Sequence, residues 1–201
     1  TTADENTGFV NQVDAGTYTL SEENGPSGYA LKSIKCGPNV NTLSETDGTV
    51  NIGAGETVVC VFTNDDVAPK LKLRKEVVND NGGTAYADDW TLRAKNGMSY
   101  LINEKGSPAN QPYAVTKTYA GKAYTPYTLS ETGPDGYSAG NWSCNGGQLS
   151  GNVVSLALGD DVTCTIINND IPPKLKVIKI VDNDWGGTLK VSDFPLYVNG
   201  D

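Results

Sequence analysis

The 201-residue chain contains no histidine. Histidine is the side chain that most often acts as a general base near neutral pH, and it is the commonest metal ligand. The sequence also lacks a serine–histidine–aspartate set, a cysteine–histidine pair and a phosphate-binding glycine loop. We therefore expect a protein that is not an enzyme and that needs neither a cofactor nor a metal ion.

Long apolar runs are missing as well, so the sequence predicts no segment that spans a membrane. Because the chain starts at Thr1 with polar residues, we expect these 201 residues to include no signal peptide and no anchor or sorting motif. Because the features described below favour a secreted protein, we interpret this sequence as a window of a longer one.

Positive charge is scarce. There are 15 Lys and Arg residues against 24 Asp and Glu residues, which gives a net charge of -9. An acidic surface repels phosphate backbones, so nucleic acid is not an expected partner. The acidic residues are spread along the chain, which is typical of a surface that keeps a protein soluble outside the cell.

Internal repetition is abundant, and it decides the interpretation of the fold. The sequence Tyr-Thr-Leu-Ser-Glu occurs at residues 18–22 and again at 127–131. Each copy is followed by Gly-Pro-x-Gly-Tyr, at residues 25–29 and 133–137.

A second repeated block begins at a proline, at residues 69–75 and 173–179. The two blocks together indicate one complete repeat at residues 70–170. The chain opens with the back of a repeat, residues 1–66, and closes with the front of another, residues 174–201. Joined end to start, the two fragments resemble strands connected by an ordinary hairpin.

The incomplete repeat can be completed in three ways. Neighbouring repeats of a tandem array can supply the missing strands, or the end of one chain can complete the start of the next by strand exchange. The two fragments can also pair within one chain, which the complete repeat between them disfavours. Some partner is needed in each case, because half a domain exposes open sheet edges and an apolar face.

Apolar residues alternate with a period of two, as in Leu71, Leu73 and Val77, and turn signals interrupt the strands at short spacing. This pattern predicts an all-β protein of tandem antiparallel, immunoglobulin-like sandwich domains with about seven strands per hundred residues. Proline-containing links at residues 65–69 and 170–173 predict short, stiff connections between domains.

The four cysteines fall as one pair in each repeat, on strands that are otherwise apolar. An even count with one pair per domain predicts disulfides and an oxidising compartment, with buried free thiols as the alternative. Metal binding is disfavoured by the long spacings and by the absence of histidine. The predicted bonds join Cys36 to Cys60 and Cys144 to Cys164.

Three polar side chains fall on strand faces that are otherwise apolar, and the incomplete repeat contains the same three. A buried lysine, carboxyl group and amide would each cost several kcal/mol unless they satisfied one another. They are Lys75, Glu131 and Asn168 in the complete repeat, and Lys179, Glu22 and Asn64 in the incomplete one.

The order of these motifs, Leu-x-Leu-x-Lys, then Tyr-x-Leu-x-Glu with Gly-Pro-x-Gly-Tyr, then a closing strand that ends in Asn, resembles the Cna-B or SpaA-type prealbumin-like domains of bacterial surface proteins. The resemblance covers nearly the whole chain. It implies domains that form stalks and pilus shafts, and many members link a first-strand Lys to a last-strand Asn by an isopeptide bond with the help of a buried Glu or Asp.

Carried over to this sequence, the resemblance assigns the bond to Lys75 and Asn168 with Glu131 assisting. In the incomplete repeat it assigns Lys179, Asn64 and Glu22, with the lysine arriving from a neighbour or from the far end of the chain. One departure is the disulfide in each domain, which can replace the isopeptide bond. The alternative is that Lys75 reaches the rim of the sheet and Glu131 binds the backbone of its turn.

The expected function is therefore a structural repeat of an extracellular microbial stalk, fibre or filament, whose partners are copies of itself or adjacent repeats. The alternative is a ligand-binding module of a surface adhesin that recognises carbohydrate or protein through tyrosines such as Tyr113, Tyr119 and Tyr124. The Asx-rich segments at residues 79–82 and 182–184 lack the EF-hand order, so we expect ordinary turns there.

Overall fold

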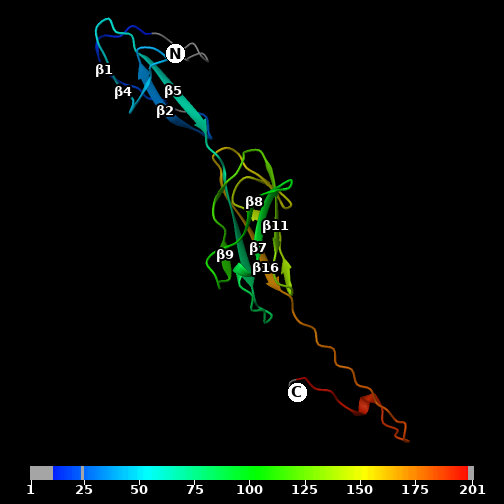
Figure 1. The fold of residues 1–201 in the computed structure, drawn as a ribbon. Helices are drawn as coiled ribbons and strands as arrows, with labels where there is room; N and C mark the ends of the chain where they lie inside the picture. The colour runs from blue at the N-terminus through cyan, green and yellow to red at the C-terminus, as the bar shows by residue number, and fades with distance from the viewer. Residues whose placement is uncertain (1–10, 24, 199–201) are drawn as a thin grey trace.

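The computed structural model describes residues 11–23 and 25–198. Three parts follow one another along the chain: an N-terminal unit (residues 11–66), a central sandwich (residues 70–170) and a C-terminal segment (residues 174–198). The N-terminal unit and the C-terminal segment lie at opposite ends of the central sandwich (Figure 1). Among the described residues, no helix is long and apolar enough to cross a membrane.

The central sandwich contains two sheets that face each other across the apolar core. The first is built on β6 (Lys70–Val78) and β16 (Asp161–Asp170), with β9 (Tyr113–Val115) and β10 (Tyr119–Ala120) beside β6, and β12 (Tyr137–Ala139) and β13 (Ser143–Cys144) beside β16. The second has the order β14 (Gln148–Ser150), β15 (Val153–Ser155), β11 (Pro126–Thr132), β7 (Thr91–Asn96) and β8 (Ser99–Lys105).

The predicted all-β architecture is confirmed, and the alternation in the sequence explains it. Every second residue of β6 is buried, including Leu71 and Leu73, while the residues between them are partly exposed. Such a strand presents one face to the core and the other to solvent. One pairing differs from the antiparallel expectation, since β6 and β16 run parallel. They are the first and last strands of the repeat, and the remaining strands lie between them in the sequence.

In the N-terminal unit, β1 (Gly16–Thr19) pairs with β4 (Thr49–Ile52), and β2 (Tyr29–Gly37) lies between β3 (Ser44–Thr46) and β5 (Val59–Asp66). These pairings repeat those of the central sandwich: Tyr18 lies opposite Val50 as Tyr127 lies opposite Val154. Among its described residues, Ile34 is the only buried apolar side chain. The unit therefore has the strands of the back of a sandwich without a closed core.

The C-terminal segment was expected to supply the front strands of a further domain. Between residues 171 and 198 the structure contains a short 3₁₀ turn (Val191–Asp193) and no strand. A strand forms when its backbone groups pair with a neighbour, and no neighbour lies beside this segment in the described structure. Its apolar side chains are exposed in consequence, with Leu175 at 73% and Ile180 at 82%.

The connection between the N-terminal unit and the central sandwich is closely fitted. The backbone N–H of Val67 donates to the Gly28 carbonyl at 2.8 Å, and the N–H of Gly159 donates to the Val67 carbonyl at 2.8 Å. A Cβ on Gly28 would lie 2.5 Å from the Cβ of Leu158, so only glycine fits here. The Gly-Pro-x-Gly loop of one unit thus packs directly on a turn of the next.

Candidate functional site

The parallel strands β6 and β16 bring two of the predicted polar residues onto the same face of the first sheet. Lys75 lies in the middle of β6, opposite Ile166 of β16. Asn168 follows Ile166 by two residues and therefore points to the same side. Both side chains are buried, Lys75 with 0% and Asn168 with 3% of its surface exposed.

Glu131 reaches the same point from β11 of the second sheet. Its Oε1 accepts a hydrogen bond from Asn168 Nδ2 at 2.7 Å, and its Oε2 lies 2.8 Å from Lys75 Nζ. The structure thus brings Lys75, Glu131 and Asn168 together between the two sheets. Lys75 lies inside the sandwich and does not reach the rim of the sheet.

The polar atoms in this cluster are incompletely satisfied. Lys75 Nζ and Glu131 Oε2 form a close ion pair at 2.8 Å, but Asn168 Oδ1 has no hydrogen-bond partner among the described residues. Burial lowers the pKa of Lys75 below its ordinary value of 10.5, while contact with Glu131 opposes that shift. A buried lysine with a lowered pKa loses its proton more easily, which is what an amine nucleophile requires.

An aromatic residue that sequence reasoning did not single out completes the site. The Trp90 ring is buried, and its centroid lies 4.7 Å from Lys75 Nζ. Tyr137 packs edge-on against Trp90 at 5.1 Å. A Cβ on Gly133 would lie 2.3 Å from the Trp90 ring. The repeated Gly-Pro-x-Gly-Tyr motif therefore makes room for this ring. In the sequence, Asp89-Trp90 matches Asp193-Phe194, and this match could have indicated an aromatic side chain at the site.

The incomplete repeat has two of its three residues together. Asn64 Nδ2 donates to Glu22 Oε1 at 2.7 Å, the same contact at the same distance as in the central sandwich. Lys179 lies in the C-terminal segment, where its Nζ is 4.5 Å from the centroid of the Phe194 ring. The structure therefore separates Lys179 from Glu22 and Asn64.

Two disulfides hold the closing strands. Cys36 is bonded to Cys60 across β2 and β5, and Cys144 is bonded to Cys164 across β13 and β16. Among the described residues no cysteine is free. Closing loops of 24 and 20 residues contributes about 3 kcal/mol each in the chain-entropy model.

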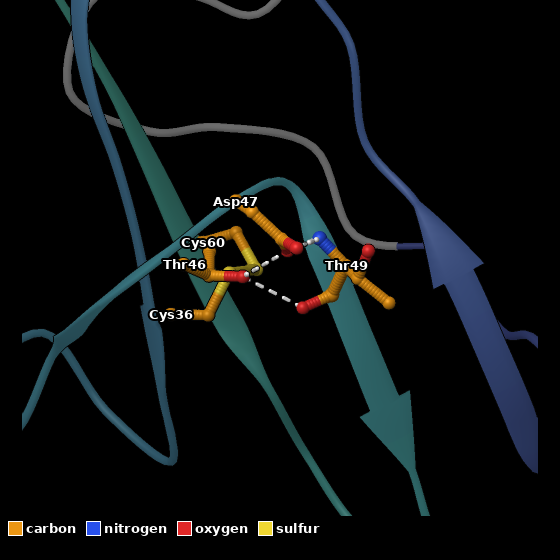
Figure 2. Close-up of a disulfide and its surroundings, with 5 residues drawn as sticks. All are labelled: Cys36, Thr46, Asp47, Thr49 and Cys60. Carbon is orange, nitrogen blue, oxygen red and sulfur yellow. Dashed lines mark hydrogen bonds between the residues drawn. A yellow bond between two sulfur atoms is a disulfide. The ribbon is translucent and has the colours of Figure 1, made fainter.

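Figure 2 shows the first of these disulfides next to the tight turn between β3 and β4. In that turn the Thr46 hydroxyl donates to the Thr49 carbonyl at 2.7 Å, and the Thr49 N–H donates to the Asp47 carboxylate at 3.0 Å. Hydrogen bonding of Thr49 to the Asp47 carboxylate lowers the pKa of Asp47. The N-terminal unit thus has a disulfide and a hydrogen-bonded turn side by side, although its core is open.

The Asx-rich turn at residues 79–83 is organised by a carboxylate of the closing strand. Asp170 accepts hydrogen bonds from the N–H groups of Asp80, Asn81 and Gly83 at 3.0, 2.9 and 2.6 Å. Burial acts to raise the pKa of Asp170, but these bonds outweigh it and lower the pKa. Within the described residues, no group of three potential metal-ligating side chains occurs.

These features define a class of protein: tandem β-sandwich domains with a buried Lys–Glu–Asn cluster beneath a parallel pair formed by the first and last strands. A family model described as a prealbumin-like fold domain, SpaA_2, matches residues 1–62 and 66–166. The chain belongs to this family.

Among solved structures, the chain is similar to the major pilin of Streptococcus pyogenes, with 14% identity over 80% of this chain and 72% of that chain and a TM-score of 0.36. It is also similar to the T-13 major pilin of a Streptococcus pyogenes serotype, with 14% identity, 80% and 68% coverage and a TM-score of 0.34. No curated protein matches the chain.

Proposed function

We propose that this chain is a structural repeat of an extracellular microbial stalk or pilus shaft, and that Lys75 and Asn168 become joined by an isopeptide bond in its central sandwich. The observation that carries the proposal is the position of Glu131, which touches both side chains at 2.8 and 2.7 Å between the two sheets. Family membership and the tandem arrangement of the domains support the structural role.

The chemistry needs no other reactant. Glu131 takes a proton from the Lys75 ammonium, and the neutral amine attacks Asn168 Cγ. The C–N bond to Lys75 forms and the bond from Cγ to Nδ2 breaks. A second proton, relayed by Glu131, leaves with Nδ2 as ammonia. The buried ammonium and carboxylate are replaced by a neutral amide and a neutral carboxyl group, so the cost of burying the two charges is removed.

Such a bond suits a protein that carries tension. The N-terminal unit joins the sandwich at the start of β6, and the chain leaves it at the end of β16. These strands are parallel and paired from Lys70 to Val78, so a pull on the chain shears them along their length. With Lys75 joined to Asn168, the load crosses directly between the strands, and everything between these two residues is protected from extension.

The ligand-binding alternative has less support. Tyr113 stacks with Arg74, and the Tyr119 hydroxyl donates to Glu104 at 2.8 Å, so both rings already have contacts within the sandwich. Tyr124 is exposed, but a single exposed tyrosine does not make a site.

The test is the intact mass of the purified chain under reducing and denaturing conditions. We expect the loss of one ammonia for each central sandwich, and tandem mass spectrometry should find residues 75 and 168 in one branched peptide. Lys75→Met, which preserves an unbranched side chain in the core, should restore the full mass. Lys72→Met on the outer face of the same strand is the matched control. A wild-type chain of unreduced mass would overturn the proposal.

A further inference from the structure

We infer that the C-terminal segment of one copy of this chain binds the N-terminal unit of a second copy as a parallel strand along β5, which joins the copies end to end. The occupant of the second copy's N-terminal unit is residues 174–198 of the first copy. Formation of a covalent link at this joint rests on the proposed function, whereas the strand pairing does not.

The binding edge is the outer edge of β5. Within the described chain, β5 pairs with β2 on one side and with no strand on the other. Its counterpart β16 pairs with β12 and β13 on the side that corresponds to β2, and with β6 on the other side. The N-terminal unit therefore has an open edge at the place where the central sandwich has β6. An open edge presents unpaired backbone groups to a new strand.

The C-terminal segment has the local conformation of the polypeptide that fills this place in the central sandwich. Asn183 Nδ2 donates to the Leu189 carbonyl at 3.0 Å, as Asn79 does to Ala85 at 3.0 Å. Lys190 N–H donates to Asp193 at 2.7 Å, and the equivalent bond beside β6 measures 2.9 Å.

The C-terminal segment also has the contact between the lysine and the aromatic ring that the central sandwich has. Lys179 Nζ lies 4.5 Å from the Phe194 ring centroid, and Lys75 Nζ lies 4.7 Å from that of Trp90. The segment has these contacts while its apolar side chains are still exposed. Because part of its conformation is already formed, less ordering entropy is lost when it binds.

The repeat fixes the register of the new pair. In the central sandwich Leu73 lies opposite Cys164, and Lys75 lies opposite Ile166. Applied to the equivalent residues, this register puts Val177 opposite Cys60, Lys179 opposite Phe62 and Val181 opposite Asn64. Lys179 of one copy then reaches the Glu22–Asn64 pair of the next, in the position that Lys75 has beside Glu131 and Asn168.

A second and independent contact fits the same arrangement. Gly28 packs on the turn at Leu158, and Gly136 is its counterpart in the central sandwich, with the same φ of +86° and open space beside it. Ile171 N–H donates to the Gly136 carbonyl at 2.8 Å, as Val67 does to Gly28.

The matching turn is present in the N-terminal unit. Gly55 has a φ of +77°, identical to that of Gly159. The Gly53 N–H donates to Glu56 at 2.8 Å, as the Ala157 N–H donates to Asp160 at 2.7 Å. Gly136 of one copy can therefore pack on the turn at Ala54 of the next, which reproduces between copies the junction already present within the chain.

The chain's own C-terminal segment cannot make this contact. β16 starts beside the N-terminal unit and runs away from it for ten residues, about 33 Å. The five residue-to-residue steps from Asp170 to Leu175 span at most about 18 Å. The chain's own segment is therefore excluded, as the opposite positions of the two parts in Figure 1 indicate, and a second copy carries the matching strand at residues 174–198.

A covalent bond can follow the pairing. The Lys179 amine, deprotonated by Glu22 of the second copy, attacks Asn64 Cγ. The new C–N bond forms, the Cγ–Nδ2 bond breaks, and Nδ2 leaves as ammonia with the proton that Glu22 relays. The product is an amide between two copies.

The test uses the full chain at increasing concentration, with mass measured by light scattering and by denaturing, reducing electrophoresis. We expect oligomers of increasing length that lose one ammonia per junction and yield a Lys179–Asn64 branched peptide. Val177→Asp, on the face that would be buried, should abolish them. Ile178→Asp, on the opposite face of the same strand, is the matched control and should preserve them.

A chain that stays monomeric at millimolar concentration, or a Lys179–Asn64 bond within single chains, would overturn the inference. Equal loss of assembly in the two variants would do the same. Oligomers that lose no ammonia anywhere, including at Lys75 and Asn168, would support the strand pairing and overturn the proposed function instead. Oligomers with the Lys75–Asn168 bond but without the Lys179–Asn64 bond would overturn the register.

Discussion

Lys75 and Asn168 lie on neighbouring parallel strands with a stagger of two residues, and Glu131 from the facing sheet contacts both. This relationship requires the first and last strands of the repeat to be adjacent. It depends on the topology of the sandwich rather than on proximity in the sequence, and the same Glu–Asn contact recurs in the N-terminal unit.

Glu131→Gln should prevent the loss of ammonia from the central sandwich, because an amide cannot accept the lysine proton. The substitution also leaves a buried ammonium without its counter-charge, which costs about 3–5 kcal/mol of folding stability. Denaturant unfolding combined with intact mass checks both effects. Glu76→Gln on the outer face of β6 serves as the control, and a Glu131→Gln chain that still lost ammonia would remove Glu131 from the mechanism.

Replacing Cys144 and Cys164 together by serine should lower the free energy of unfolding by about 3 kcal/mol, because the loop between them is released in the unfolded chain. The Lys75–Asn168 bond should still form, since the cysteines lie outside the Lys–Glu–Asn cluster. The measurement is denaturant unfolding of the variant against the oxidised wild type, with intact mass as the second readout. Loss of both the disulfide and the ammonia release would show that the disulfide positions β16 for the reaction.

Gly133→Ala should destabilise the central sandwich by about 1–3 kcal/mol, because the new methyl group would overlap the Trp90 ring. Near-ultraviolet circular dichroism should report the displaced tryptophan. Gly25→Ala is the matched control, because the equivalent space in the N-terminal unit is open. It should be neutral in dilute monomer and should weaken assembly, where Phe194 of a second copy would occupy that space.

Asp170 should make the central sandwich sensitive to acid. Its pKa is lowered in the folded state, so the stabilisation is present above the ordinary aspartate pKa of 3.8 and is lost as the pH falls through the lower, folded value. Asp170→Asn should therefore reduce stability at neutral pH and flatten the acid limb of a urea-unfolding series between pH 7 and pH 2. Asp135→Asn, in an exposed loop, should leave the wild-type profile unchanged.

The sequence was sufficient to predict the β-sandwich, because period-two alternation in β6 marks the same residues that the structure buries. It also placed Lys75, Glu131 and Asn168 on apolar faces, since strand geometry fixes which residues share a side. It did not predict the parallel pairing of β6 and β16, because a period-two pattern contains no information on strand direction. The role of Trp90 was also not predicted, because Gly133 and Trp90 are far apart in the sequence and meet only through the pairing of β11 with β7.

Gly28 packs on Leu158 at the junction between the N-terminal unit and the central sandwich. A junction that admits no side chain leaves little freedom to bend, so the angle between successive domains is nearly fixed. In the end-to-end assembly proposed above, junctions that all repeat that angle would add their small rotations into a regular superhelix whose pitch is set by a few backbone atoms. A methyl group at this one glycine would alter the persistence length of the whole assembly without touching the interior of any domain.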